Sequence, residues 1–285
     1  MRMLVLENRV TAYVDILGFS ELIDRLKDRE DVLASIERTL YLIRDKASAV
    51  YVPEPPPVEC LSTTEAPRIA FGQPAERTVE MSAFSDCFAI SDGGPLACTV
   101  VARVQELAFT LLETDGVLCR GGIVEDLLHH RDGVAFGRAL VRAHALENRV
   151  ASYPRILVED AFAQRYLAWE KELQQYVQAP AAAASVLTGL SYPKLLKRDS
   201  DGCYFVDLFV PIPDVVPNGW NLDGMRWPER FRSVRSRLAE RLAETVSGGR
   251  PDHLAKIRWL IARFNESVGT AEFRRRVCSI EPISI

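Results

Sequence analysis

The order in which strand-like and helix-like patterns follow one another limits this chain to a few folds. Residues 9–17 are apolar on both sides of the expected strand, which is typical of a central strand covered on both faces. Across residues 20–50 apolar side chains recur at helical spacing, which predicts one or two helices. Two short β-like runs, 79–84 and 87–91, then predict a hairpin with Asp86 at its tip.

The same alternation continues to about residue 160. Residues 95–116 have the pattern of an amphipathic helix, and residues 117–137 that of a second hairpin. A helix over 138–151 and a strand over 154–159 follow. The resulting order, β-α-β-β-α-β-β-α-β, predicts an α+β fold with a ferredoxin-like core, an antiparallel sheet covered by helices, and one added hairpin.

The pattern is weaker after residue 160. A strand is expected within 201–213, and two helices are expected over about 226–247 and 251–267. The chain therefore divides into a core over residues 1–160 and an α-rich C-terminal extension over residues 161–285, which we expect to pack on the core.

Composition and charge exclude several classes of protein. The 285 residues carry a formal net charge of −4, which argues against a nucleic-acid partner because such binding needs a basic stripe. No run of about 18 apolar residues exists, so no membrane span is expected, and a cytoplasmic location is predicted. The 6 cysteines and 4 histidines form no zinc-binding spacing.

Two aspartates stand where strands end. Asp15 lies near the end of the apolar run of residues 9–17, and Asp86 lies at the tip of the first hairpin. In a ferredoxin-like sheet these strands can lie side by side, so the two carboxylates could hold two divalent metal ions that clamp a triphosphate. The peptide carbonyl of Ile16 is a further candidate ligand.

The residues that follow Asp15 suit a phosphate. Leu17, Gly18, Phe19 and Ser20 open the predicted helix, whose free N–H groups and positive dipole end favour phosphate oxygens. Gly18 would let the backbone approach closely. The alternative for either aspartate alone is a helix cap or turn residue.

These motifs resemble those of the class III nucleotidyl cyclases over roughly residues 9–160. The segment "DILGFS" at 15–20 matches the first metal motif of that family, and "FSDCFAIS" occupies the place of the second. "RGGI" at 120–123 and "FGRALVRAHALE" at 136–147 are similar to a third block. Two residues of these blocks, Arg120 and Glu147, are expected to fix the fold rather than to perform chemistry.

The sequence departs from the family where the family reads a purine and stabilises the transition state. Val141 and Ala145 stand in place of an asparagine and an arginine, and Ser82 and Val134 in place of the lysine and acidic residue that recognise the base. This combination is similar to the cyclases of bacterial anti-phage systems that make cyclic pyrimidine nucleotides. The resemblance implies a pyrimidine nucleotide, with UTP favoured over CTP on resemblance alone.

Three further residues are candidates for the altered site. Tyr51 could stack on a base, and Arg138 and Arg142, one helical turn apart, could stabilise charge on the α-phosphate. The simpler alternatives are a tyrosine packed at a helix end and a solvated helix face. His129 and His130 fall at the turn of the second hairpin, where both are expected to be exposed.

The resemblance also implies partners. Class III sites form between two cores, with metals from one subunit and base or ribose contacts from the other, so a single core implies a head-to-tail homodimer that needs manganese or magnesium. Three alternatives stay open at this point. They are a cytidylate cyclase, a purine cyclase with a rearranged pocket, and a non-catalytic cyclase-like module that binds nucleotide or a partner protein.

Overall fold

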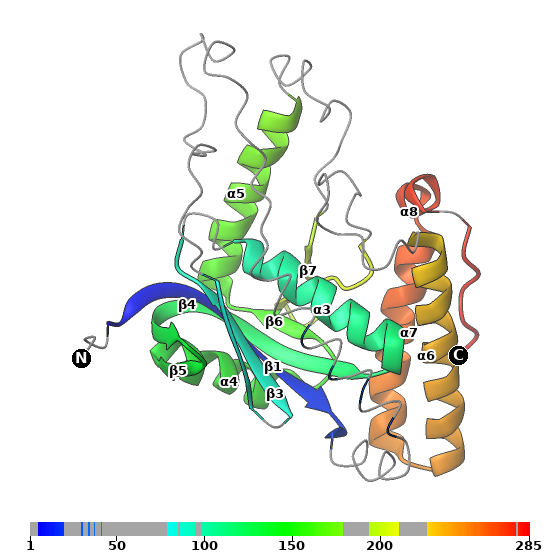
Figure 1. Ribbon diagram of the computed structural model, residues 1–285. Coiled ribbons are helices and arrows are strands. Elements are labelled where there is room, and N and C mark those ends of the chain that lie inside the picture. Colours follow the sequence, from blue (N-terminus) through cyan, green and yellow to red (C-terminus); the bar gives the residue numbers. More distant parts are fainter. Residues whose placement is uncertain are drawn as a thin grey trace.

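The computed structural model describes residues 5–19, 79–84, 86–94, 98–178, 194–210, 227–277 and 279–285, and the isolated helical positions 30, 34, 37 and 41. Within them eight strands form one sheet, in the order β2-β3-β1-β4-β6-β8-β7, with β5 paired to β4 alone (Figure 1). The strands are β1 (Glu7–Leu17), β2 (Glu80–Phe84), β3 (Cys87–Asp92), β4 (Leu118–Arg131), β5 (Val134–Gly137), β6 (Ile156–Val158), β7 (Leu196–Arg198) and β8 (Tyr204–Val206).

The long central strand β1 organises the sheet. It pairs antiparallel with β3 on one side and with β4 on the other, and β2 pairs antiparallel with β3. The order β2-β3-β1-β4 is that of a ferredoxin-like sheet, so the predicted α+β core is confirmed. Beyond it β6 pairs parallel with β4, because the chain crosses between them through a helix, and β8 and β7 continue the sheet.

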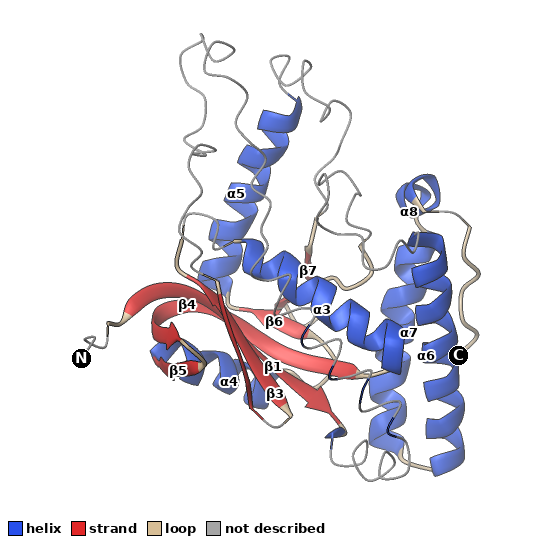
Figure 2. Ribbon diagram, in the orientation of Figure 1, coloured by secondary structure: helices blue, strands red, loops and turns tan. Residues whose placement is uncertain are grey.

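Helices lie on both faces of this sheet (Figure 2). Their bounds are α3 (Thr99–Asp115), α4 (Arg138–Val150), α5 (Asp160–Gln178), α6 (Trp227–Gly248), α7 (Pro251–Gly269) and α8 (Ala271–Arg276). Side chains alternate along β1, so Val10, Ala12, Val14 and Ile16 join the core on the α3 side. Tyr13 packs with α4 on the opposite face, called the α4 face below. None of the described helices is long and apolar enough to cross a membrane.

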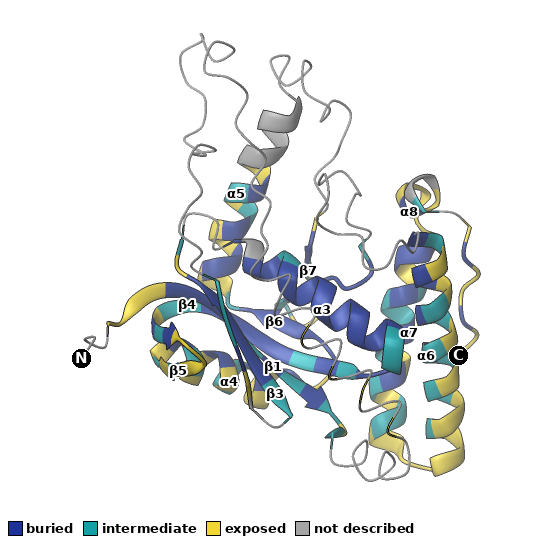
Figure 3. Ribbon diagram, in the orientation of Figure 1, coloured by how far each residue is buried: buried dark blue, intermediate teal, exposed yellow. Residues whose placement is uncertain are grey.

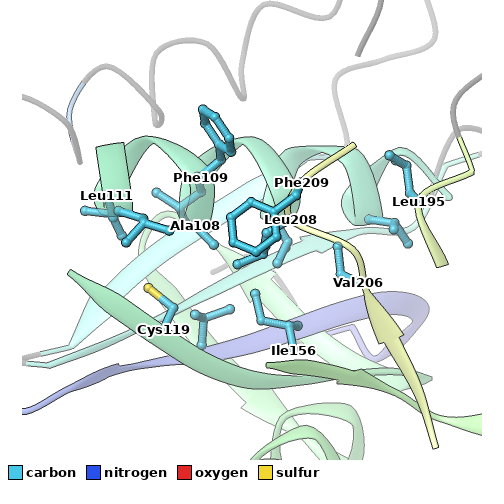
Figure 4. Packing of buried hydrophobic residues seen from close by; sticks show 14 of the residues in the cluster. Ala108, Phe109, Leu111, Cys119, Ile156, Leu195, Val206, Leu208 and Phe209 are labelled. Atoms are coloured by element: carbon cyan, nitrogen blue, oxygen red, sulfur yellow. The ribbon is translucent and has the colours of Figure 1, made fainter. Parts of the chain in front are cut away.

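Helix α3 is buried along its length because it is covered on two sides (Figure 3). One side meets the sheet, where Ala108 and Leu111 lie over Cys119 of β4 and Ile156 of β6 (Figure 4). On the other side α6 places Arg230 against α3, where it forms ion pairs with two glutamates and stacks on Phe109 at 4.8 Å. The buried carboxylates on this side of α3 thus have a cation as partner.

The C-terminal part shares the core with the N-terminal part. Phe231, Phe264 and Phe273 belong to the same hydrophobic cluster as Val14 of β1, and β7 and β8 lie in the same sheet. The expected helices over 226–247 and 251–267 are confirmed as α6 and α7. The expected division of the chain into a core and a C-terminal extension at residue 160 remains a prediction. Sequence patterns did not reveal α5, β7 or α8.

The two glycines of "RGGI" allow β4 to approach its neighbours closely. A Cβ at Gly121 would lie 2.5 Å from the carbonyl oxygen of Tyr13 on β1. A Cβ at Gly122 would lie 2.4 Å from the carbonyl oxygen of Ala143 on α4. Helix α4 therefore sits directly on the backbone of β4, and its position depends on a residue without a side chain.

Gly122→Ala is expected to destabilise the protein by about 2–3 kcal/mol, because backbone atoms of α4 must move to admit the methyl group. Gly269→Ala is the control, since nothing lies within 4 Å of a Cβ there. Urea unfolding followed by circular dichroism measures both. Equal stability of the two variants would show that α4 does not pack on β4 in this way.

Candidate functional site

Asp15 is held on the α4 face near the end of β1. It pairs with Cys87 of β3 and with Arg120 of β4, so three strands fix its backbone. Burial raises the pKa of its carboxyl group, the Arg120 guanidinium lowers it, and the nearby Asp86 raises it. A half-buried carboxylate near the end of a strand, close to a second carboxylate, is a candidate ligand for a cation.

Asp86 lies in the turn between β2 and β3. The sequence pattern predicted this position at the tip of a hairpin. The backbone carbonyl of Asp86 accepts a hydrogen bond of 2.8 Å from the backbone N–H of Ile16. This bond ties the turn to the end of β1, next to Asp15. The fold therefore brings together two aspartates that are far apart in the sequence.

Arg120 connects Asp15 to helix α4. Its Nη2 lies 3.4 Å from Oδ2 of Asp15, and its Nε forms an ion pair with Glu147 of α4. The side chain of Glu147 is only 3% exposed. Burial raises the pKa of Glu147, and Arg120 lowers it. Arg120 thus contacts the candidate site directly, a role that the sequence analysis did not give it.

Two aromatic rings complete the surroundings of Asp15. Tyr13, two residues earlier on the same face of β1, meets His144 of α4 edge-on with ring centroids 5.0 Å apart. Its hydroxyl interacts with the thiol of Cys87, and burial together with this interaction raises the pKa of Tyr13. The spacings Tyr13–Asp15 on a strand and His144–Glu147 on a helix were the signals that could have revealed these neighbours.

The structure describes three of the four residues that were predicted to contact a phosphate. Leu17 ends β1, and Gly18 has a φ of 72°, a left-handed conformation that glycine adopts at the least cost. Phe19 is helical and packs against the main hydrophobic cluster. Ser20 and Tyr51 lie outside the described residues.

Ser82 lies on the α4 face of β2, in the row of residues that contains Ala89 and Tyr13. Its hydroxyl oxygen is 2.9 Å from Nε2 of His130, whose other ring nitrogen is 2.8 Å from the hydroxyl oxygen of Ser91. His130 is only 4% exposed, so the expectation that it is exposed at a turn was wrong. Strand β4 continues past the expected turn, and the turn itself is formed by Asp132 and Gly133.

Arg138 and Arg142 lie on α4 at the other end of the sheet from Asp15. Both form ion pairs with Asp126 of β4, and Arg142 also pairs with Glu159. Asp126 is six residues from Arg120 along β4, a distance of about 20 Å in a strand. Within one chain, neither arginine is brought to the Asp15–Asp86 pair.

The donor atoms near Asp15 suit magnesium or manganese. Two carboxylates and the carbonyl of Ile16 are hard oxygen donors, which these ions prefer. The described residues contain no group of three or more histidine, cysteine, aspartate or glutamate side chains that could hold a metal. Two carboxylates match the way magnesium is usually held beside a phosphate, where substrate oxygens and water supply the remaining ligands.

Comparisons with known proteins give distant likenesses. No protein-family model matches the chain, and no curated protein sequence matches it. The catalytic core of a rhodopsin–guanylyl cyclase with converted specificity, in complex with ATPαS, is similar over 70% of this chain and 95% of its own, with 13% identity and a TM-score of 0.36.

A class III adenylyl cyclase-like ATP-binding protein from Pseudomonas aeruginosa is similar over 54% of this chain, with 16% identity and a TM-score of 0.27. The match covers 34% of that protein.

Arg120→Met is expected to cost about 3 kcal/mol of stability near pH 7, because it leaves the buried Glu147 carboxylate without its cation. Folding raises the pKa of Glu147 above the ordinary 4.5, and loss of the arginine raises it further. The folded variant therefore binds the proton more tightly than the unfolded chain, so its stability deficit shrinks as the pH falls below the folded pKa.

Urea unfolding of both proteins at pH 5 and pH 8 measures this difference. Arg138→Met is the matched control, because the Arg138 side chain is 70% exposed and its ion pair with Asp126 contributes less than about 1 kcal/mol. A deficit in Arg120→Met that is the same at both pH values would contradict the assignment.

Proposed function

We propose that this protein is a class III nucleotidyl cyclase that converts UTP to 3′,5′-cyclic UMP and pyrophosphate. The observation that carries the proposal is the meeting of Asp15, from "DILGFS", with Asp86, from the hairpin tip, beside a glycine in the left-handed conformation. The ferredoxin-like order β2-β3-β1-β4 that brings them together is the arrangement expected of that family.

In the proposed reaction the ribose 3′-oxygen attacks the α-phosphorus of UTP. A bond forms between the 3′-oxygen and the α-phosphorus, and the bond from the α-phosphorus to the oxygen that bridges to the β-phosphorus breaks. The 3′-hydroxyl proton passes to solvent, and pyrophosphate leaves. Two divalent ions held by Asp15, Asp86 and the Ile16 carbonyl would supply Lewis-acid activation of the hydroxyl group and neutralise charge on the triphosphate. The backbone at Leu17–Ser20 would face the phosphates, where N–H groups at a helix start are favourable.

Arg120 has a positioning role in this proposal. It contacts Asp15 on one side and Glu147 on the other, so it fixes the side chain of Asp15. A cation 3.4 Å from Asp15 also keeps that carboxylate ionised, which counteracts the effect of burial. An ionised Asp15 is the form that binds a divalent cation.

A homodimer with sites at the interface fits the position of the arginines. Arg142, the candidate for stabilising charge on the α-phosphate, and Arg138, a candidate phosphate contact, lie far from Asp15 of their own chain. They would reach a nucleotide only from a second copy placed head to tail.

Tyr51 is proposed to stack on the base. The cellular role that the resemblance suggests is that of a cytoplasmic second-messenger synthase in anti-phage defence.

The pyrimidine base is proposed from the residues at the purine-reading positions. Ser82 is bonded to a histidine, and Val134 is 55% exposed, so neither offers the charged pair with which a purine edge is read in the family. The alternative is a nucleotide-binding module without cyclase activity. It is favoured by Val141 and Ala145, which stand where the family has its asparagine and arginine.

Asp15→Asn and Asp86→Asn are expected to lower cyclase activity at least 100-fold, because each removes a charged ligand of the metal ions. Purified protein is incubated with each of the four nucleoside triphosphates and manganese, and cyclic products are measured by mass spectrometry. Asp132→Asn is the control, since Asp132 lies in an exposed turn with a φ of 52° that asparagine also accepts. Absence of a cyclic product from every nucleotide would favour the non-catalytic module, and cAMP or cGMP as the main product would exclude the pyrimidine assignment.

A shared site predicts complementation between two inactive variants. Asp15→Asn and Arg142→Ala are each expected to be nearly inactive as homodimers. In a co-expressed 1:1 mixture, half of the dimers are heterodimers that carry one site with both changes and one intact site, so about a quarter of the wild-type activity returns. If the mixture is no more active than the single variants, Arg142 does not act across the interface.

A further inference from the structure

A chain of buried polar groups crosses four strands on the α4 face, away from the aspartates. Arg9 of β1 donates from Nε to the hydroxyl oxygen of Ser91 on β3, at 2.9 Å. Ser91 is 2.8 Å from Nδ1 of His130 on β4, and Nε2 of His130 is 2.9 Å from the hydroxyl oxygen of Ser82 on β2. All four residues are buried, with exposures of 5% or less.

Donor chemistry and burial together assign a direction to each hydrogen bond in this network. The guanidinium of Arg9 only donates, so Ser91 accepts from it. Among the described residues the Ser91 hydroxyl group has one other partner, Nδ1 of His130. Ser91 is 0% exposed, so its proton is assigned to this nitrogen rather than left buried without an acceptor. Burial, and then the positive charge of Arg9, lowers the pKa of His130 to about 4, so the ring is neutral at pH 7.

A neutral imidazole that accepts at Nδ1 carries its proton on Nε2. The network thus assigns the Nε2–H tautomer to His130 and makes Ser82 Oγ the acceptor of its proton. Among the described residues, His130 is the one hydrogen-bonding partner of the Ser82 hydroxyl group. The Ser82 proton therefore has no acceptor among the described residues, which leaves Ser82 as a donor toward a ligand.

We propose that the relay Arg9–Ser91–His130–Ser82 makes Ser82 an obligatory hydrogen-bond donor that reads a carbonyl group of the nucleotide base. This inference rests on the proposed function, which places a base beside Ser82. Ser82 is 5% exposed, and we assign to it the edge of the base furthest from the ribose. In a pyrimidine the group on C4 lies opposite the ribose-bearing N1.

The relay therefore distinguishes uracil from cytosine. Uracil carries a carbonyl oxygen on C4, which accepts the Ser82 proton. Cytosine carries an amino group there, so two donors would meet, and a buried polar group left without a partner is costly. The burial of Ser91 favours this polarity, because reversal of its bond to His130 would leave the Ser91 proton without an acceptor among the described residues.

The first test compares UTP with CTP. The wild-type protein is expected to prefer UTP in kcat/KM, and Ser82→Ala is expected to reduce the UTP/CTP ratio about tenfold, the effect of one lost hydrogen bond. Ser91→Ala is expected to reduce the ratio as well, although Ser91 would not touch the base, because His130 can then take the other tautomer. A purely structural role would lower activity with both nucleotides equally.

Ser236→Ala on α6 is the matched control and is expected to leave the ratio unchanged, since its hydroxyl bonds only to Glu240 among the described residues. Thermal unfolding verifies that each variant is folded. An unchanged ratio in folded Ser82→Ala, or a wild-type preference for CTP, would overturn the proposal.

Two measurements separate this proposal from the proposed activity. Calorimetric binding of UTP and CTP gives the same ratio without catalysis, so a protein that binds nucleotide but does not cyclise it still tests the relay. Nitrogen-15 NMR of labelled histidine, with the His130 signals assigned through His130→Gln, reports the tautomer directly. We expect a neutral Nε2–H ring between pH 5 and 8, and an Nδ1–H tautomer would refute the relay even in an active cyclase.

Discussion

The ion pairs of Arg120 hold together the two layers on which the candidate site is built. One pair reaches Asp15 on the central strand, and the other reaches Glu147 on α4. The glycines that follow Arg120 bring β4 against β1 and α4 against β4, so the guanidinium lies between two carboxylates that would otherwise be buried without a counter-charge. The position of α4, and with it the placement of Arg138 and Arg142, depends on this arrangement.

The α4 face carries two polar clusters of different character. Asp15, Asp86, Arg120 and Glu147 form a charged cluster that suits a metal ion and a triphosphate. The second cluster, around His130, has hydroxyl groups and a neutral imidazole, and Arg9 supplies a positive charge. Such a division matches what a nucleotide requires, since its phosphates need charge and its base needs directed hydrogen bonds.

The sequence was most informative where its patterns were long or its turns specific. The strand around Asp15, both hairpins, α3, α4, α6 and α7 followed from periodicity and turn residues. Helix α5 was missed although Phe162, Ala163 and Tyr166 are buried at helical spacing, because a low-complexity segment follows it. The strand expected within 201–213 is confirmed as β8. Strand β7 has three residues and gains strand character from pairing with β8, so no local pattern revealed it.

The sequence by itself determined which residues have candidate chemistry, and it placed Asp15 and Asp86 at strand ends that a ferredoxin-like sheet brings together. That was possible because alternation, helical spacing and glycine turns are local properties of the chain. Tertiary structure decided which groups face one another. The burial of His130 between Ser82 and Ser91, and the contact of Arg120 with Asp15, depend on strands that are distant in sequence. Partner choice and hydrogen-bond direction arise only when such strands pack, because burial removes the water that would otherwise satisfy each polar group.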